Sequence, residues 1–222
     1  QGAKRVALAI ESGEIFRGEV WKAAVARVKA SGEALHFMGL LSDGNVHSHQ
    51  DHLEALLRQA KRDGVRAARV HILLDGRDVG ETSALDYVDR LERCLAELNA
   101  DGTADDAIAS GGGRMAITMD RYGADWDMVR RGWETHVRGE GPRFASARAA
   151  IEAHRRARPG VIDQDLPPFV IERGGRPVGP IRDGAGVILF NFRGDRAIEI
   201  SQAFEDESFS GFDRGPREET HA

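Results

Sequence analysis

Short hydrophobic runs with the length of β-strands alternate along this chain with longer segments whose apolar residues recur at helical spacing. The strand-like runs cover residues 34–41, 70–74, 106–110 and 187–192, and the helical segments cover 3–10, 18–30, 51–62, 84–99, 126–138 and 147–157. Strands that are separated by helices pair in parallel, because each connecting helix crosses a face of the sheet before the next strand begins. The chain is therefore expected to be an α/β protein with three layers, α/β/α, around a mostly parallel sheet.

One stretch interrupts this alternation. Residues 168–181 contain two short alternating runs about Gly174 and Gly175, a pattern that predicts a β-hairpin. We expect this hairpin to be an antiparallel excursion that precedes the last parallel strand. The side chains expected to cap helices are Thr82 or Ser83, Asp125 and Ser146.

The composition excludes several classes of protein. With 222 residues, 41% hydrophobic and 30% charged, the chain is long enough for one large domain or one domain with a small appendage, and its composition is ordinary for a soluble globular protein. A net charge of −5 gives no global basic field for nucleic acid or an anionic membrane, and no apolar run approaches the ~20 residues of a membrane span. The single cysteine, Cys94, excludes a disulfide framework and a four-cysteine zinc site, and fits a cytoplasmic location.

Each of the four predicted strands is followed by a loop rich in Arg, Asp or His. In an open α/β sheet the carboxyl ends of parallel strands converge on one crevice, and ligands bind there. The arginines that these loops contribute are Arg77, Arg114, Arg121, Arg193 and Arg196. Clustered guanidinium groups need an anion among them, and their planar fork matches phosphate and carboxylate. The loops therefore predict a pocket for a small, multiply charged phosphorylated acid, to which His47 can donate a hydrogen bond.

A glycine-rich segment, SGGGR at residues 110–114, follows the third predicted strand. As a loop it would allow the backbone to approach an oxyanion closely. It lacks the Lys-Ser/Thr of a P-loop and the spacing of a dinucleotide fingerprint, so ATP and NAD are not expected as ligands.

The string HSHQDH, residues 47–52, allows a different interpretation. It matches the H-x-H-x-D-H motif of dinuclear zinc hydrolases, in which imidazole and carboxylate ligands hold two Zn²⁺ ions and an activated water. Those enzymes need further histidines and a bridging aspartate, and we expect no second histidine cluster here. The remaining histidines are His36, His71, His136, His154 and His221. Asp51 and His52 are then explained as the start of a helix, and a metallohydrolase stays the less favoured alternative.

Several strings together identify a family. LLSDGNVHSH, VHILLDGRDV, ASGGGRMAITMDRYGADWD, DQDLPPFVI and FNFRGDR occur in this order along nearly the whole chain. They closely resemble the phosphotransferase, or substrate-binding, domain of cofactor-independent (2,3-bisphosphoglycerate-independent) phosphoglycerate mutase, in the form found in plants and trypanosomatids. Asn45 stands where that family usually has a second glycine, and its tolerance of a left-handed backbone predicts that the change is accommodated.

The resemblance implies roles for particular residues. Asp78 is implied as the catalytic proton acceptor for the glycerate hydroxyls, because a carboxylate among arginines stays ionised and oriented. The implied substrate-binding residues are His47, Arg77, Asp78, Arg114, Arg121, Arg193 and Arg196.

The resemblance also implies a larger parent protein. In this family an alkaline-phosphatase-like domain carries a serine nucleophile and two Mn²⁺ ions, and neither that serine's motif nor the metal-ligand motifs occur in this chain. Residues 1–222 are then expected to be one substrate-binding domain, a fragment of a monomeric, cytoplasmic isomerase of glycolysis and gluconeogenesis. That parent interconverts 3-phosphoglycerate and 2-phosphoglycerate through a phosphoserine. The chain alone is expected to bind no metal or other cofactor and to lack turnover; a stand-alone phosphoglycerate-binding module is the alternative.

Overall fold

The structure is a computed structural model that describes residues 2–215; His221 lies outside this range. The helices are α1 (Gly2–Glu11), α2 (Glu14–Arg17), α3 (Glu19–Ser31), α4 (Gln50–Arg62), α5 (Ala84–Asn99), α6 (Trp126–His136), α7 (Ala147–Ala157) and α8 (Ile198–Glu205), with 3₁₀ turns η1 (Asp163–Asp165) and η2 (Gly194–Arg196). The strands are β1 (Leu35–Leu41), β2 (Ala68–Leu74), β3 (Ala107–Gly113), β4 (Arg143–Phe144), β5 (Phe169–Arg173), β6 (Arg176–Pro177) and β7 (Gly186–Leu189).

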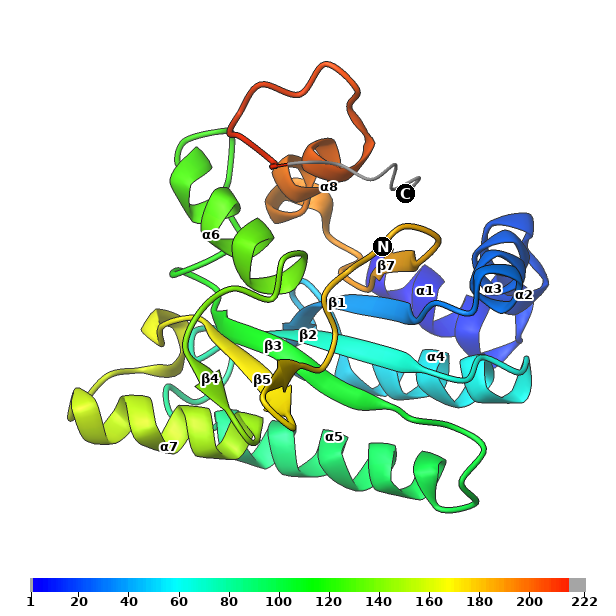
Figure 1. Cartoon of the computed structure of the whole chain (residues 1–222), viewed down its shortest axis with the longest axis horizontal. Coiled ribbons are helices and arrows are strands. Elements are labelled where there is room, and N and C mark those ends of the chain that lie inside the picture. The colour runs from blue at the N-terminus through cyan, green and yellow to red at the C-terminus, as the bar shows by residue number, and fades with distance from the viewer. Residues whose placement is uncertain (1, 216–222) are drawn as a thin grey trace.

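The strands form one twisted sheet in the order β4-β5-β3-β2-β1-β7, with β6 paired to β5 alone (Figure 1). β1 lies between β2 and β7, and β2 lies between β1 and β3; all three of these pairings are parallel. β5 runs antiparallel to β3 and to β6. The predicted mostly parallel sheet with an antiparallel excursion is thus confirmed.

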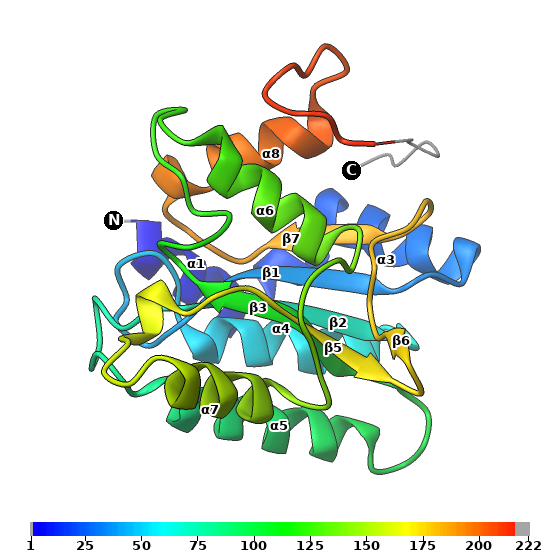
Figure 2. The ribbon, with the colours of Figure 1, turned by 60° about the vertical axis from the view of Figure 1, so that its left-hand side comes forward.

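Helices cover both faces of the sheet and make the predicted three layers. α4, α5 and α7 lie on one face, and α6 and α8 lie on the other (Figures 1 and 2). Phe37 packs into the core cluster that includes α3, α4, α5 and α7, whereas the next residue, Met38, packs into the cluster with α6 and α8. Alternate residues of β1 therefore fill opposite layers, as the two-residue period of a strand requires. Among the described residues, no helix has the length and apolar character to cross a membrane.

The third strand is longer than the sequence predicted. β3 continues through the glycine run and pairs Gly113 with Leu74 of β2. A Cβ atom would lie 2.6 Å from the Ile72 carbonyl oxygen at Gly111, and 2.2 Å from the Gln164 carbonyl oxygen at Gly113. The expectation of a glycine-rich loop for an oxyanion is therefore wrong: these glycines let the neighbouring chain pack against the strand.

The expected caps are confirmed at two helices and corrected at a third. Asp125 accepts a hydrogen bond from the Met128 amide, and Ser146 accepts one from the Ala149 amide. Ser83 occupies the N-cap of α5 but its side chain makes no capping bond. The buried Asp163 of η1 instead accepts from the Ala84 amide at 2.8 Å. A distant carboxylate supplies this cap, which no local pattern could predict.

Candidate anion-binding site

A cavity of about 210 Å³ lies where the loops after β1, β2, β3 and β7 meet. These four strands are mutually parallel, so their carboxyl ends share one edge of the sheet, where ligands bind in open α/β folds. The residues that line the cavity are Val46, His47, Arg77, Asp78, Arg114, Arg121, Arg193, Asp195 and Arg196. All seven residues that the sequence predicted for the site are thus brought together.

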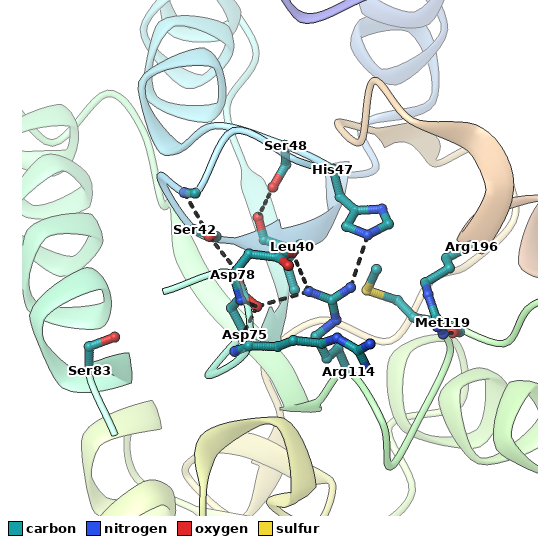
Figure 3. Close-up of polar contacts among 12 residues, drawn as sticks. Leu40, Ser42, His47, Ser48, Asp75, Asp78, Ser83, Arg114, Met119 and Arg196 are labelled. Carbon is teal, nitrogen blue, oxygen red and sulfur yellow. Dashed lines mark hydrogen bonds and ion pairs between the residues drawn. The ribbon is translucent and has the colours of Figure 1, made fainter. Parts of the chain in front are cut away.

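Arg114 is the buried centre of this site, with only 2% of its surface exposed. Its Nη1 donates to Asp75 Oδ1 at 2.9 Å and to Asp78 Oδ2 at 2.6 Å, and its Nη2 lies 2.9 Å from His47 Nε2. These contacts join the loops after β1, β2 and β3 (Figure 3). A guanidinium group that is buried must be paired to be tolerated, and here two carboxylates pair with it.

The contact with Arg114 determines the tautomer of His47. Guanidinium can only donate, so Nε2 of His47 accepts and the ring proton lies on Nδ1. Burial and the Arg114 charge lower the pKa of His47, which favours the neutral ring. Nδ1 has no hydrogen-bond partner among the described residues and lies 3.7 Å from Asp195 Oδ1. The Nδ1–H of His47 is therefore buried without a partner in a residue that lines the cavity.

Asp75, the first residue of the DGRD string, holds the turn that carries Arg77 and Asp78. It is 2% exposed, and its Oδ1 accepts from the amides of Arg77 and Asp78 at 3.2 and 3.0 Å. Its Oδ2 accepts from Ser42 Oγ at 2.5 Å. Sequence reasoning did not assign Asp75 a role; the available signal was an Asp at the first position of a turn, where such side chains bind backbone amides two and three residues on.

Asp195 is a second residue of the site that was not predicted. Its Oδ2 lies 3.0 Å from Arg193 Nη2 and 3.8 Å from Arg121 Nε. Its Oδ1 is buried and has no hydrogen-bond partner among the described residues. The RGDR string places this carboxylate between Arg193 and Arg196, so the charge alternation was visible in the sequence. The carboxylate of Asp195 neutralises part of the positive charge of Arg193 and Arg121 that a bound anion would also contact.

The remaining arginines differ in how firmly they are held. Arg196 donates from Nη1 to the Met119 carbonyl oxygen at 2.9 Å, and burial, followed by the Arg114 charge, lowers its pKa without making it neutral. Arg121 is more exposed and donates from Nη2 to the Tyr122 hydroxyl at 2.7 Å. Arg77 is exposed and forms no hydrogen bond or ion pair through its side chain with another described residue. The cavity thus contains arginines that the protein holds in place, such as Arg196, and arginines that are free to turn toward a ligand, such as Arg77.

The three histidines of HSHQDH do not converge on a metal site. His47 turns into the cavity, His49 caps α4 by accepting from the Asp51 amide, and His52 packs against Phe192. Within residues 2–215, no group of three or more His, Cys, Asp or Glu side chains is placed to hold a metal ion. The start of α4 at this string agrees with the helix that its second half predicted.

A larger cavity, of about 780 Å³, lies beside the edge strand β7 and is lined mainly by apolar side chains of α1, α3 and β7. It lacks the clustered arginines that an anion needs. The smaller cavity is therefore the candidate site for a charged ligand. Fold and cavity together define an α/β domain with an arginine-lined cavity at the carboxyl edge of its parallel strands.

Comparison with known proteins assigns the family. The model of the family described as BPG-independent PGAM N-terminus matches residues 6–222, and the chain belongs to this family. A probable 2,3-bisphosphoglycerate-independent phosphoglycerate mutase of Leptospira interrogans is 58% identical over 216 residues, which cover 97% of this chain and 39% of that protein. The 2,3-bisphosphoglycerate-independent phosphoglycerate mutase of Trypanosoma brucei brucei is 49% identical, over 96% of this chain and 39% of that protein.

A solved structure gives the same assignment. The crystal structure of Leishmania mexicana phosphoglycerate mutase at low cobalt concentration superposes with a TM-score of 0.94 at 48% identity, covering 96% of this chain and 39% of that one. The fold and the family implied by the sequence motifs are thereby confirmed. The chain spans about two fifths of the length of these relatives.

Proposed function

We propose that this chain is the substrate-binding domain of a 2,3-bisphosphoglycerate-independent phosphoglycerate mutase and binds 3-phosphoglycerate and 2-phosphoglycerate. The observation that carries the proposal is the charge of the 210 Å³ cavity: five arginines and two aspartates line it, which leaves a net charge of +3 with His47 neutral. A phosphoglycerate carries a carboxylate and a phosphate, and its combined negative charge matches this excess.

Different residues of the cavity bind the anionic groups and orient the glycerate. Arg121, Arg193 and Arg196 also line the cavity, are less buried than Arg114, and are the groups available to the phosphate and carboxylate oxygens. The free Nδ1–H of His47 donates to an oxygen of the ligand. Asp78, held through Oδ2 by Arg114, accepts a hydrogen bond from a glycerate hydroxyl and acts as the proton acceptor.

The parent activity is proposed from the family to which the chain belongs. It is an isomerase of glycolysis and gluconeogenesis in the cytoplasm, in which a second, phosphatase-like domain supplies a serine and two Mn²⁺ ions. The relatives are longer than this chain, and the described residues include no cluster that could hold a metal. Residues 1–222 then form one domain of a monomeric two-domain enzyme. The isolated chain binds the glycerate and positions it, and does not transfer the phosphoryl group.

Titration of the isolated chain with 3-phosphoglycerate, followed by NMR, tests the proposal. Shifts should be confined to the loops that line the cavity. Arg193→Ala and Arg196→Ala should each weaken binding by about 1.5–3 kcal/mol, the usual value of a hydrogen bond to a charged group. Arg193, which is 47% exposed, should fall at the lower end because solvent screens it. The same preparation should show no interconversion of 3- and 2-phosphoglycerate.

Arg62→Ala is the matched control, because Arg62 lies at the exposed end of α4 with only a 3.5 Å contact to Gln59. Arg155 is unsuitable, since it pairs with the buried Asp163 that caps α5. Equal losses of affinity from Arg62→Ala and Arg196→Ala, or shifts away from the cavity, would refute the site. Turnover by the isolated chain would refute the assignment of chemistry to a second domain.

A further inference from the structure

A row of buried hydrogen-bonding side chains runs through the core from β1 to the loop after β3. His36 Nδ1 lies 2.9 Å from His71 Nε2, and His71 Nδ1 lies 2.6 Å from Ser110 Oγ. His136 of α6 continues the row, with Nδ1 2.7 Å from Ser110 Oγ and Nε2 2.9 Å from Thr118 Oγ1. These five residues, here called the histidine chain, are each no more than 2% exposed. Sequence reasoning expected no second histidine cluster, and that expectation is wrong.

The histidine chain is directional. A neutral imidazole has one N–H and one acceptor nitrogen, so the proton position on one ring fixes the proton position on the next. If Thr118 donates to His136, then His136 donates to Ser110, and Ser110 in turn donates to His71. Burial lowers the pKa of His36 and of His136 to about 3, so the rings are neutral near pH 7. Loss of one link therefore leaves a buried donor or acceptor unsatisfied at that link.

The last residue of the histidine chain, Thr118, has a strained backbone conformation. Thr118 has φ 68°, a left-handed conformation that a β-branched residue rarely adopts. Its amide donates to the Met128 carbonyl oxygen at 3.0 Å, and its hydroxyl contacts His136. Gly132 of α6 lies so close that a Cβ atom there would be 2.1 Å from Thr118 Oγ1. Such a conformation persists only where its surroundings hold it, and α6 provides that support.

Thr118 lies between the arginines of the anion-binding site. Arg114 precedes it by four residues and Arg121 follows it by three, in the loop that connects β3 to α6. The next residue, Met119, accepts the hydrogen bond from Arg196 Nη1. The backbone conformation at Thr118 therefore sets the direction in which the loop leaves toward Arg121 and the place of the oxygen that anchors Arg196.

We propose that Thr118 and His136 are positioning residues, which hold the 114–121 loop in the conformation that directs Arg121 and Arg196 into the anion cavity. Neither residue lines the cavity. They act through the loop, and Ser110 and His71 act one step further away by keeping His136 in one tautomer. The inference rests on the proposed function, because it concerns the binding of phosphoglycerate at that site.

Two variants of Thr118 separate positioning from general stability. Thr118→Val keeps the size and the β-branch but removes the hydroxyl, whereas Thr118→Ser keeps the hydroxyl. Thr118→Val should weaken 3-phosphoglycerate binding about tenfold or more, the equivalent of a displaced hydrogen bond to a charged group. Thr118→Ser should restore the affinity to near that of the unaltered chain. Affinity is measured by NMR titration at a temperature where each variant is folded.

Leu95→Ala is the control for stability. Leu95 is buried on α5, on the opposite face of the sheet from α6, and its truncation destabilises the fold without touching the loop. It should lower the unfolding midpoint and leave the affinity unchanged. If Leu95→Ala weakens binding as much as Thr118→Val does, the effect is one of general stability and the positioning role is wrong.

A second pair applies if Thr118→Val does not fold. In His136→Gln the side-chain amide reaches the place of Nε2 and can keep the bond to Thr118; in His136→Asn it reaches the place of Nδ1 and keeps only the bond to Ser110. The Asn variant should lose affinity and the Gln variant should largely retain it. Equal affinities in this pair would overturn the role of His136.

Arg196→Ala separates this inference from the function on which it rests. If Arg196→Ala weakens binding and Thr118→Val does not, the anion site stands and the positioning role is wrong. If neither variant changes the affinity, the proposed function fails and the positioning role fails with it. Loss of affinity in both, with recovery in Thr118→Ser, supports the two together.

Discussion

Two polar clusters lie close together in this fold and are satisfied in opposite ways. In the anion-binding site several buried polar atoms lack a hydrogen-bond partner, among them His47 Nδ1, Arg114 Nε and Asp195 Oδ1. In the histidine chain each link between neighbouring side chains is between 2.6 and 2.9 Å long. The site is charged and opens to a cavity, whereas the histidine chain is neutral and closed to solvent.

The difference indicates what each cluster is for. A buried polar atom without a partner costs free energy, so folding alone would not favour such atoms at the site. A ligand in the cavity, with both acceptor oxygens and hydroxyl groups, would supply partners to those that line it. A fully partnered neutral row costs little and fixes one geometry, which suits the support of a strained loop. Thr118 is the residue at which the second cluster acts on the first.

The largest expected effect comes from breaking the charged cluster at its centre. Arg114→Met removes the guanidinium that forms ion pairs with Asp75 and Asp78, and leaves the buried Asp75 without a positive partner. Removal of one partner from a buried ion pair costs about 3–5 kcal/mol. The free energy of unfolding in urea at pH 7.5 should fall by that amount, and binding of 3-phosphoglycerate should be lost.

Arg130→Met is the matched control for this loss. Arg130 forms ion pairs on the exposed face of α6, at 3.1 Å to Asp127 and 3.8 Å to Glu134, and is 45% exposed. Exposed pairs of this kind contribute less than about 1 kcal/mol. A loss from Arg114→Met no greater than that from Arg130→Met would mean that the site tolerates two uncompensated carboxylates.

Lowering the pH should reduce the stability of the fold through the histidine chain. In the unfolded chain histidine binds a proton below its ordinary pKa of 6.5, whereas the folded pKa of His36 and of His136 is about 3. Between these values the unfolded state holds more protons, so the stability of the fold decreases as the pH falls. Each of the two histidines should contribute about 1.4 kcal/mol of lost stability per pH unit below 6.5. Burial lowers the pKa of His71 also, which adds to the effect.

Urea denaturation at pH 7.5, 6.5 and 5.5 measures this slope, with a loss of about 3 kcal/mol from these two histidines at the lowest pH. The loss should persist at about 0.5 M salt, because buried groups are screened little. A stability that does not change between pH 7.5 and 5.5 would show that the histidine chain accepts a proton without cost, contrary to its burial.

The sheet was predictable because its signals are local. β1, β2 and α4 to α7 begin or end within a few residues of the sequence expectation, since periodicity and caps such as Asp125 and Ser146 act over one or two turns. The errors arose from contacts between distant segments. β3 extends through its glycines because the chain near Gln164 packs on them, and α5 is capped by Asp163 from far along the sequence.

The difference between local signals and contacts of distant segments also explains which site residues could be predicted from the sequence. The charged residues of the cavity follow parallel strands, so topology brings them together; the strand-end argument named the arginines and His47, and the family resemblance added Asp78. The histidine chain draws its members from β1, β2, β3, α6 and a loop, with sequence separations of up to 39 residues between bonded partners. No spacing within one element predicts such a row, because the register between strands determines which side chains meet.

The smallest expected effect comes from comparing Asn45 with Thr118, two of the non-glycine residues with positive φ in these loops. Asn45 in the loop after β1 has φ 56°, as its position after Gly44 predicts, and its side chain is exposed. Asparagine adopts this conformation readily, so Asn45→Gly should change the free energy of unfolding by no more than about 0.5 kcal/mol and leave 3-phosphoglycerate affinity unchanged. Asn45→Val places a β-branched side chain there and should cost about 1–2 kcal/mol, since no chain of hydrogen bonds holds it as one holds Thr118. Urea denaturation of both variants measures the difference. If Asn45→Val is as stable as Asn45→Gly, the left-handed backbone at this loop is not a constraint, and the contrast with Thr118 loses its basis.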